Sequence, residues 1–350
     1  HYDNLYYSAK ARSEADWLVG INASRALSIV RKGGYSLGRV QTPALAMVCR
    51  RYIENRDFSS VPYWKLSVAA EKEGVSLKAV SSSAFDNEAD AQSALAMLRE
   101  QSRLTVTSVA KKVGHTSPPL LFDLTSLQKE ANRKHGFSAD KTLSIAQSLY
   151  EKKITTYPRT GSRYISEDVF EEVPVLLRNI GKTLSNPLNR HSVDNTKVTD
   201  HHAIIPTGQS PSGLSETETK VFDLIARHFI AAFYPDCLVS TTSVEGTAGK
   251  VKFKTSGKEI LEPGWRVVFE TETPTEASEA KEGEEGGEAS EALLPTFTEG
   301  ETGEHIPELR EKQTQPPKYY TEATLLRAME TAGKFVEQEE LREAMKENGI

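Results

Sequence analysis

The spacing of apolar residues predicts helices at both ends of the chain and in its middle. In residues 12–32 the apolar positions recur about every 3.6 residues, as on one face of a helix, and Gly33-Gly34 ends the pattern. Further helices are predicted, with capping residues in parentheses, at 42–55 (Thr42, with Pro43 as the first helical residue), 86–101 (Asp86), 123–135, 139–153 (Ser138), from 166 (Ser166), 215–233 (Ser215 with Glu218), from 321 (Thr321 with Thr324) and 336–348.

A second pattern, in which apolar and polar residues alternate, predicts strands in two separated regions. In chain order these strands cover 64–70, 75–80 (a hairpin with the first), 104–113, 238–244, 251–255 and 265–269. Since β-rich character returns after a helical stretch, we expect a β-rich domain of residues 53–116 and 237–315. A helical domain of residues 117–236 is then inserted into it, with Pro118-Pro119 at the boundary.

The composition is that of an ordinary soluble protein with two or three domains. The chain has 350 residues, of which 38% are hydrophobic and 26% charged. It contains no apolar run long enough to span a membrane and no signal-peptide pattern. Cys49 and Cys237 lack the spacing of metal ligands, so we expect a reducing compartment, no disulfide framework and no zinc site.

Charge is distributed very unevenly along the chain. The net charge is −6, but residues 271–291 alone contain eight Glu and one Lys. We interpret this acidic run as a disordered loop, with a DNA-mimicking or regulatory arm as the alternative. Residues 103–163 hold eleven Lys or Arg against four Asp or Glu, and residues 1–56 hold nine against four. Such clusters are typical of polyanion-binding proteins, although solvated faces also produce them.

The segment 154–165 is the strongest candidate for chemistry. Pro158 favours an extended backbone before it, and alternation then places Tyr157 and Arg159 on one side. A phenol beside a guanidinium suits a phosphodiester, because the phenol can attack phosphorus while the guanidinium donates to its oxygens. The alternative is a surface strand with a structural tyrosine.

Three further stretches contain candidate groups for the same chemistry. His201 and His202 precede an apolar run, where a histidine is usually structural, but an imidazolium there can donate to a phosphate. The predicted helix at 42–55 has free backbone N–H groups at its start, which attract a phosphate. Arg39 and Gln41 flank this position. Residues 123–153 have the helix–tight turn–helix layout of DNA-reading domains, although most helix pairs are plain packing.

Five separated motifs resemble those of type IA DNA topoisomerases, in the topoisomerase III form. They are ADWLVGINASR (15–25), SLGRVQTP (36–43), TYPRTGSRYI (156–165), HHAIIPT (201–207) and PPKYYTEATLL (316–326). The resemblance implies that Tyr157 is the nucleophile that retains the 5′ phosphate of a cut DNA strand, assisted by Arg159 and His201. It further implies DNA contacts by Asn22, Ser24, Arg25, Arg39, Gln41, Ser162 and Arg163. His202 matches no essential position.

The resemblance also implies an architecture. It is a multidomain α+β torus with two winged-helix-like helical domains joined by the β-rich hinge domain. Residues 1–52 with 316–350 form one helical domain and residues 117–236 the other. The hole holds duplex DNA, while single-stranded DNA binds at the cleavage site. The enzyme relaxes negative supercoils and decatenates, and we expect a monomer in the bacterial cytoplasm, associated with the nucleoid.

The magnesium of this family is bound by an N-terminal Toprim domain, which the present sequence does not contain. The chain opens on His1 and stops at a helix-end signal, so we expect a fragment of a larger protein. Such a fragment is expected to bind single-stranded DNA without cleaving it and to hold no metal itself. A non-enzymatic helix-turn-helix DNA-binding protein and a protein-interaction scaffold stay open as alternatives.

Overall fold

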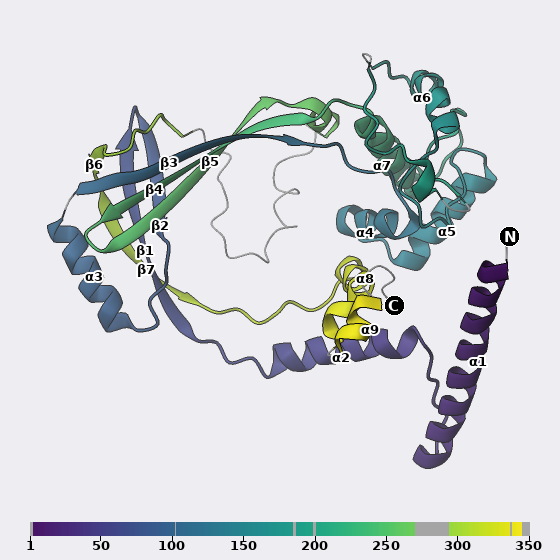
Figure 1. Cartoon of the computed structure of the whole chain (residues 1–350). Coiled ribbons are helices and arrows are strands. Elements are labelled where there is room, and N and C mark those ends of the chain that lie inside the picture. The colour runs from purple at the N-terminus through teal and green to yellow at the C-terminus, as the bar shows by residue number, and fades with distance from the viewer. Residues whose placement is uncertain are drawn as a thin grey trace. The chain divides into compact units, whose positions relative to one another are not determined.

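The computed structural model describes residues 3–101, 103–184, 187–198, 201–269, 294–336 and 338–344. It divides into two compact units (Figure 1). Unit 1 combines residues 1–59 with 316–350, and unit 2 comprises residues 60–315. None of the helices in the described ranges combines the length and apolarity needed to cross a membrane. The acidic run 271–291 and the end of the helix predicted at 336–348 lie outside the described residues.

Unit 2 contains a seven-stranded antiparallel sheet in the order β6-β3-β4-β5-β2-β1-β7. The strands are β1 (Pro62–Lys72), β2 (Val75–Ser81), β3 (Arg103–Thr116), β4 (Cys237–Ala248), β5 (Val251–Glu262), β6 (Thr302–Glu304) and β7 (Ile306–Gln313). The predicted hairpin of β1 and β2 is confirmed, and its two-residue turn has positive φ at both Glu73 and Gly74. Strands on both sides of residues 117–236 therefore share one sheet.

The strand predicted at 265–269 is wrong. Residues 265–268 belong to a 3₁₀ helix, η2 (Gly264–Val268), and Phe269 is its C-cap. Gly264 has φ +51°, and a Cβ there would lie 2.3 Å from the carbonyl oxygen of Asp236, so the chain turns sharply at a position that only glycine fits. The indole nitrogen of Trp265 then donates to the carbonyl of Thr116 over 2.9 Å, which fixes this turn against the end of β3.

One helix, α3 (Glu88–Glu100), packs against the sheet and builds its core. Leu95 and Leu98 pack with Leu66 and Val68 of β1 and Phe253 of β5. The helix begins one residue later than predicted, because Asn87 rather than Asp86 caps it. The Asn87 side chain accepts a hydrogen bond from the backbone N–H of Asp90 over 2.9 Å.

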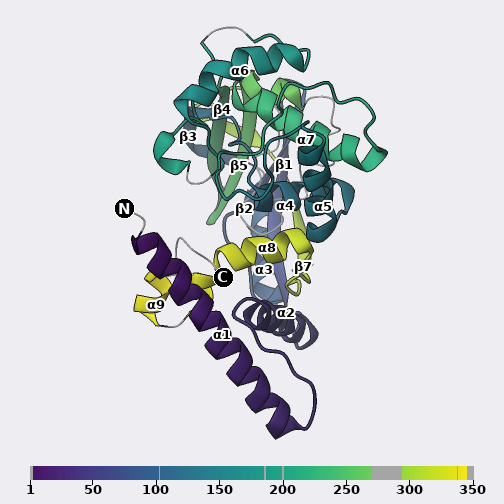
Figure 2. The same cartoon turned by 90° about the vertical axis from the view of Figure 1, so that its right-hand side faces the viewer.

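Four helices gather at one end of the long strands of unit 2. They are α4 (Leu124–His135), α5 (Ala139–Glu151), α6 (Glu167–Asn179) and α7 (Glu216–Ala232), and α4, α5 and α7 pack on one another (Figure 2). The predicted caps Ser138 and Ser215 are confirmed, the latter in a capping box with Glu218. Ser166 occupies the predicted capping position of α6, without a capping hydrogen bond from its side chain.

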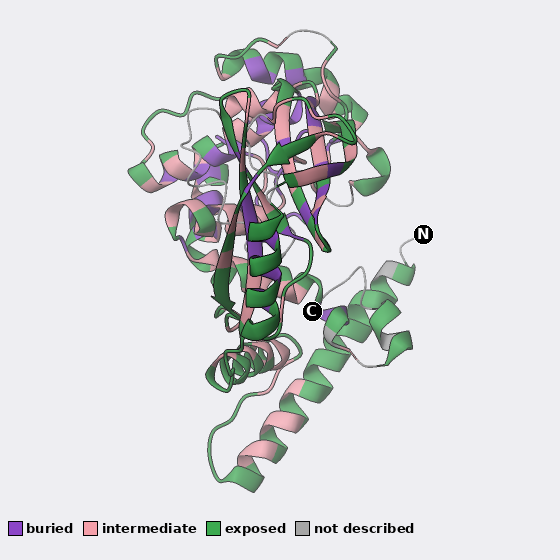
Figure 3. Cartoon of the chain, turned by 90° about the vertical axis from the view of Figure 1, so that its left-hand side faces the viewer, coloured by how far each residue is buried: buried purple, intermediate pink, exposed green. Residues whose placement is uncertain are grey.

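The described part of unit 1 contains helices and no strand, and its winged-helix character stays a prediction. Its helices are α1 (Asp3–Arg31), α2 (Gln41–Arg56), α8 (Glu322–Glu330), the 3₁₀ helix η5 (Ala332–Phe335) and α9 (Glu339–Ala344). Helix α1 starts nine residues before the prediction and is largely exposed (Figure 3). Thr42 does not cap α2, since Val40 takes that position and the Thr42 hydroxyl accepts from the N–H of Gly38. The predicted cap of α8 by Thr321 with Thr324 is confirmed.

Candidate functional site

Two segments far apart in sequence, 154–165 and 201–207, lie side by side in unit 2. The backbone N–H of Thr156 donates to the carbonyl of Ile205 over 2.9 Å, and the N–H of Ile205 donates to the Thr156 hydroxyl over 3.0 Å. The N–H of Ala203 donates to the carbonyl of Tyr164 over 2.9 Å. Ile204 and Ile165 are buried beneath these contacts. The two motifs that carry the chemical candidates therefore form one site.

The phenol of Tyr157 and the imidazole of His201 are neighbours at this site. Their ring centroids are 4.6 Å apart, with 48° between the ring planes. Tyr157 is half-buried and His201 is exposed, so the pair lies at the surface. The hydroxyl of Thr160 donates to the carbonyl of His201 over 3.0 Å and ties the two segments together again. A polyanion arriving from solvent can reach both rings.

The guanidinium of Arg159 has no partner among the residues that the structure describes. Exposure alternates along it, with Pro158 and Thr160 buried, Tyr157 half-buried and Arg159 exposed. The backbone bends at Pro158, between the two residues, so the placement of Tyr157 and Arg159 on one side stays a prediction. Arg159 forms no ion pair or hydrogen bond with any residue that the structure describes. Its guanidinium therefore keeps its donors for a ligand.

Helix α5 leads directly into the site and is held at its end by Glu218 of α7. The Glu218 carboxylate accepts hydrogen bonds from Lys152 over 2.6 and 2.8 Å and from the hydroxyl of Ser148 over 2.7 Å. The bond from Lys152, followed by those from the N–H of Ser215 and from Ser148, lowers the pKa of Glu218 from 4.5 to about 2. Lys152 lies five positions before Tyr157, so this contact fixes the end of α5 from which the Tyr157 segment starts.

A half-buried histidine lies behind the 201–207 segment. His228 of α7 stacks on Phe122, with 3.9 Å between ring centroids, and the carbonyl of Phe122 accepts from the N–H of Ile204. Burial lowers the pKa of His228 from 6.5 to about 4, against the opposing effect of Glu130. The imidazole is therefore neutral at physiological pH and acts as a core side chain.

Two of the predicted DNA-binding residues have structural partners in unit 2. Ser162 is 4% exposed, and its hydroxyl donates to the carbonyl of Lys197 over 2.8 Å. Arg163 is half-buried and donates from Nε to the carbonyl of Leu121 over 3.1 Å. Both side chains stabilise the loop that carries Arg159. Direct DNA contacts by them stay a prediction.

The other predicted DNA-binding residues belong to unit 1. Arg39 donates to Asp16 over 2.6 Å, and Gln41 donates to the hydroxyl of Ser36 over 2.8 Å. Ser24 exchanges hydrogen bonds with the backbone of Leu37, which holds the loop before α2 against α1. Asn22 and Arg25 are exposed on α1. The ion pair with Asp16 means that Arg39 would have to change partners to bind a phosphate.

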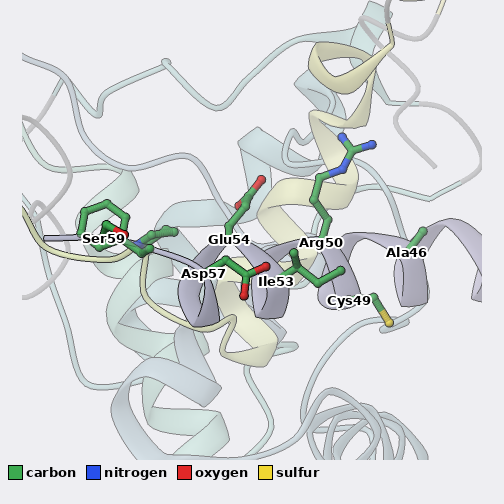
Figure 4. A pocket seen from close by; sticks show the side chains of 9 residues that line it. Ala46, Cys49, Arg50, Ile53, Glu54, Asp57 and Ser59 are labelled. Atoms are coloured by element: carbon green, nitrogen blue, oxygen red, sulfur yellow. The ribbon is translucent and has the colours of Figure 1, made fainter.

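An open pocket on α2 contains none of the predicted catalytic groups. It is lined by residues of unit 1: Ala46, Cys49, Arg50, Ile53, Glu54, Asp57, Phe58, Ser59 and Pro317 (Figure 4). Cys49 is an exposed free thiol there. The lining combines apolar side chains with the charged side chains of Arg50, Glu54 and Asp57. None of the residues predicted to carry chemistry lines this pocket, so Tyr157 stays the candidate site.

Two residues that shape the site were not predicted from the sequence. One is Glu218, which was expected only as part of a helix cap. The other is Tyr150 of α5, whose ring meets that of Tyr157 edge to face with 5.4 Å between centroids. A signal for Tyr150 was its position in the last turn of the helix that precedes the motif. Nothing in the sequence linked Glu218 to Lys152, 66 positions earlier.

Comparisons with known proteins agree on one family. The family model described as DNA topoisomerase matches residues 1–334. DNA topoisomerase 3 of Bacillus cereus is 35% identical over 99% of this chain and 49% of its own length. DNA topoisomerase 3 of Bacillus subtilis is 37% identical over 97% of this chain and 48% of its own length. The chain thus spans about half the length of the curated relatives it matches.

A solved structure supports the same assignment of the fold. Full-length topoisomerase I from Thermotoga maritima superposes with a TM-score of 0.68 and 26% sequence identity. The match covers 91% of this chain and 52% of that one. The mixed α/β architecture with its antiparallel sheet is therefore shared with a known protein.

Proposed function

Because the chain belongs to the type IA DNA topoisomerase family, we propose that Tyr157 is the nucleophile that cuts one strand of DNA. The observation that carries this proposal is the 4.6 Å approach of the Tyr157 and His201 rings, next to an exposed Arg159 without a partner among the described residues. These three groups supply a nucleophile and two donors for a phosphodiester. They come from two segments that the fold brings together.

The proposed step is a transesterification in which no phosphodiester energy is lost. The phenolic oxygen of Tyr157 bonds to phosphorus and releases its proton, while the bond from phosphorus to the 3′ oxygen breaks and that oxygen takes up a proton. The strand end that carries the 5′ phosphate stays bound to the protein as a phosphotyrosine. Attack on this phosphorus by the 3′ hydroxyl of the other strand end reverses the step. A phenol is mostly protonated at neutral pH, so the reaction depends on screening the phosphate charge. Arg159 and His201 donate to its non-bridging oxygens.

The described residues do not fit a magnesium site. No group of three or more His, Cys, Asp or Glu side chains in the described ranges could hold a metal ion. No step of the proposal therefore runs through a metal on these residues. We propose that the Mg²⁺ used by this family is bound by side chains of a Toprim domain. Residues 1–350 alone are therefore proposed not to cleave DNA efficiently.

The DNA-binding role extends to unit 1 in this proposal. Arg39 and Gln41 precede or begin α2, where free backbone N–H groups favour a phosphate, and Asn22 and Arg25 are exposed on α1. The proposed domains are residues 1–52 with 316–350, residues 53–116 with 237–315, and residues 117–236. Their toroidal arrangement, the strand passage it permits, the monomeric state and the bacterial cytoplasmic location all rest on the family resemblance.

Replacement of the phenol tests the proposed nucleophile. In the protein that forms the covalent complex, Tyr157→Phe should abolish capture of labelled single-stranded DNA that survives denaturation. Tyr164→Phe is the matched control, because it lies in the same segment and its hydroxyl lies 3.4 Å from Lys197. We expect the control to keep capture. If Tyr157→Phe still captures DNA, Tyr157 is not the nucleophile.

A further inference from the structure

A third aromatic ring lies beside the Tyr157–His201 pair, and the proposed reaction gives it no role. Tyr150, in the last turn of α5, meets Tyr157 edge to face with 76° between the ring planes. It is 40% exposed in spite of its size. Its hydroxyl forms no hydrogen bond with any residue in the described ranges. Tyr150 is thus an aromatic surface left open next to the proposed nucleophile.

The three rings form a row in which Tyr157 is the middle member. Successive centroid separations along it are 5.4 Å from Tyr150 to Tyr157 and 4.6 Å from Tyr157 to His201. A nucleotide that flanks a phosphodiester at Tyr157 is joined to it through one sugar only. Its base therefore falls within reach of the ring next to Tyr157. Exposed aromatic rings are the usual surface on which unpaired bases stack.

The ring of Tyr150 also has a fixed support, which a stacking surface needs. Glu218 holds the last turn of α5 through its hydrogen bonds with Ser148 and Lys152, two residues on either side of Tyr150. Lys153 follows with a left-handed backbone, φ +60°, and is exposed, and its backbone N–H donates to the carbonyl of Tyr150 over 2.8 Å. A rigid aromatic ring next to an exposed cation is the combination that binds single-stranded nucleic acid.

We propose that Tyr150 stacks on an unpaired nucleobase that flanks the phosphodiester held at Tyr157. This inference rests on the proposed function, since it names the base that accompanies the reacting phosphate. The ligand is single-stranded DNA, because a base inside a duplex has both faces covered by its neighbours. Tyr150 then contributes to binding through its ring and contributes nothing through its hydroxyl.

The test compares a base-bearing strand with a bare backbone. Binding of oligothymidylate of about eight nucleotides, a length typical of single-strand sites, is measured beside binding of an abasic strand of equal length. Tyr150→Leu keeps an apolar side chain and removes the ring, and it should weaken oligothymidylate binding about tenfold while leaving the abasic strand unchanged. Tyr150→Phe keeps the ring and should bind both strands as the wild type does. Thermal unfolding confirms that each variant is folded.

The outcomes separate this inference from the function on which it rests. Equal weakening of both strands by Tyr150→Leu would mean that Tyr150 acts through packing on Tyr157, and would overturn the stacking role. If Tyr150→Leu binds both strands as the wild type does, the stacking role would also be overturned. In both of these outcomes the wild-type protein still binds DNA, so the proposed function stands. Failure of the wild-type protein to bind any single strand would overturn both.

Discussion

The hydroxyl of Thr160 donates a 3.0 Å hydrogen bond to the backbone carbonyl of His201, across 41 positions of sequence. The same hydroxyl oxygen accepts from the N–H of Ser162 over 3.1 Å. Thr160 follows Arg159 directly, so one buried side chain links the segment that carries the guanidinium to the segment that carries the imidazole. The spacing of the proposed catalytic groups depends on this bond.

Removal of that hydroxyl should loosen the site. Thr160→Val keeps the shape of the side chain but removes the partly buried hydrogen bond to the His201 carbonyl and leaves the buried Ser162 N–H without this partner. We expect the free energy of unfolding to fall by about 1–3 kcal/mol, since unsatisfied buried groups cost that much. Urea unfolding measures the change. Thr196→Val, at an exposed hydroxyl bonded to Asp194, is the control and should cost less. Equal stability of both variants would contradict the role given to Thr160.

Arg159 should act through its charge on the DNA backbone. Arg159→Ala should weaken binding of single-stranded DNA at every sequence and reduce the slope of log affinity against log salt by about 1. Arg99→Ala, at an exposed position on α3, is the matched control and should leave the slope unchanged. The affinity of both variants for single-stranded DNA is measured at several salt concentrations. An unchanged slope in Arg159→Ala would show that Arg159 does not contact a phosphate.

Glu218 makes stability depend on pH in the acid range. The pKa of its carboxyl is lowered from 4.5 to about 2 in the folded protein, so its stabilising effect is complete above about 4.5 and is lost as the pH falls towards 2. Glu218→Gln should lower stability at neutral pH by about 1–3 kcal/mol, because Lys152 and Ser148 lose a charged acceptor. The variant should also show a flatter stability profile between these pH values.

A second carboxylate of α7 provides the control for that measurement. Glu216 pairs with Lys220 on the exposed surface of the helix, and its side chain is 81% exposed. Glu216→Gln should change stability little, as exposed ion pairs contribute little. An acid profile of Glu218→Gln that is as steep as that of the wild type would show that another group causes the dependence.

His228 should make stability rise with pH in a higher window. Burial lowers the pKa of its imidazole from 6.5 to about 4, so between these values the unfolded chain binds the proton that the folded chain rejects. Stability should therefore fall as the pH is lowered from about 6.5 to about 4. His228→Phe, which keeps a ring to stack on Phe122, should lose this part of the dependence. Unfolding by urea at several pH values checks it, and an unchanged slope in the variant would contradict the account.

Local chemistry made much of the fold predictable. The caps at Ser138, Ser215 and Thr321 follow from side chains that bond the first free N–H groups of a helix. The strands β6 and β7 were missed, because β7 is an edge strand rich in charged residues with little apolar alternation. Residues 265–269 read as a strand by composition, but the left-handed turn at Gly264 placed residues 265–268 in a 3₁₀ helix.

The candidate site was predictable only in part. Alternation around Pro158 predicts that Tyr157 and Arg159 share a side, and this stays a prediction because the backbone bends at Pro158. The approach of His201 to Tyr157 follows from tertiary hydrogen bonds between distant segments, which no local pattern contains. The pattern gave no sign that Ser162 and Arg163 bond to backbone carbonyls of Lys197 and Leu121, because those partners lie about 35 to 42 positions away.

The most direct test of Tyr157 as the nucleophile is the identity of the residue that carries DNA after cleavage. The covalent complex, formed by the protein with its full set of domains, is digested and the DNA-linked peptide is sequenced by mass spectrometry. We expect a peptide from residues 154–163 with a 5′-phosphoryl group on the oxygen of Tyr157. An adduct on any other residue, or one that retains a 3′ phosphate, would contradict it.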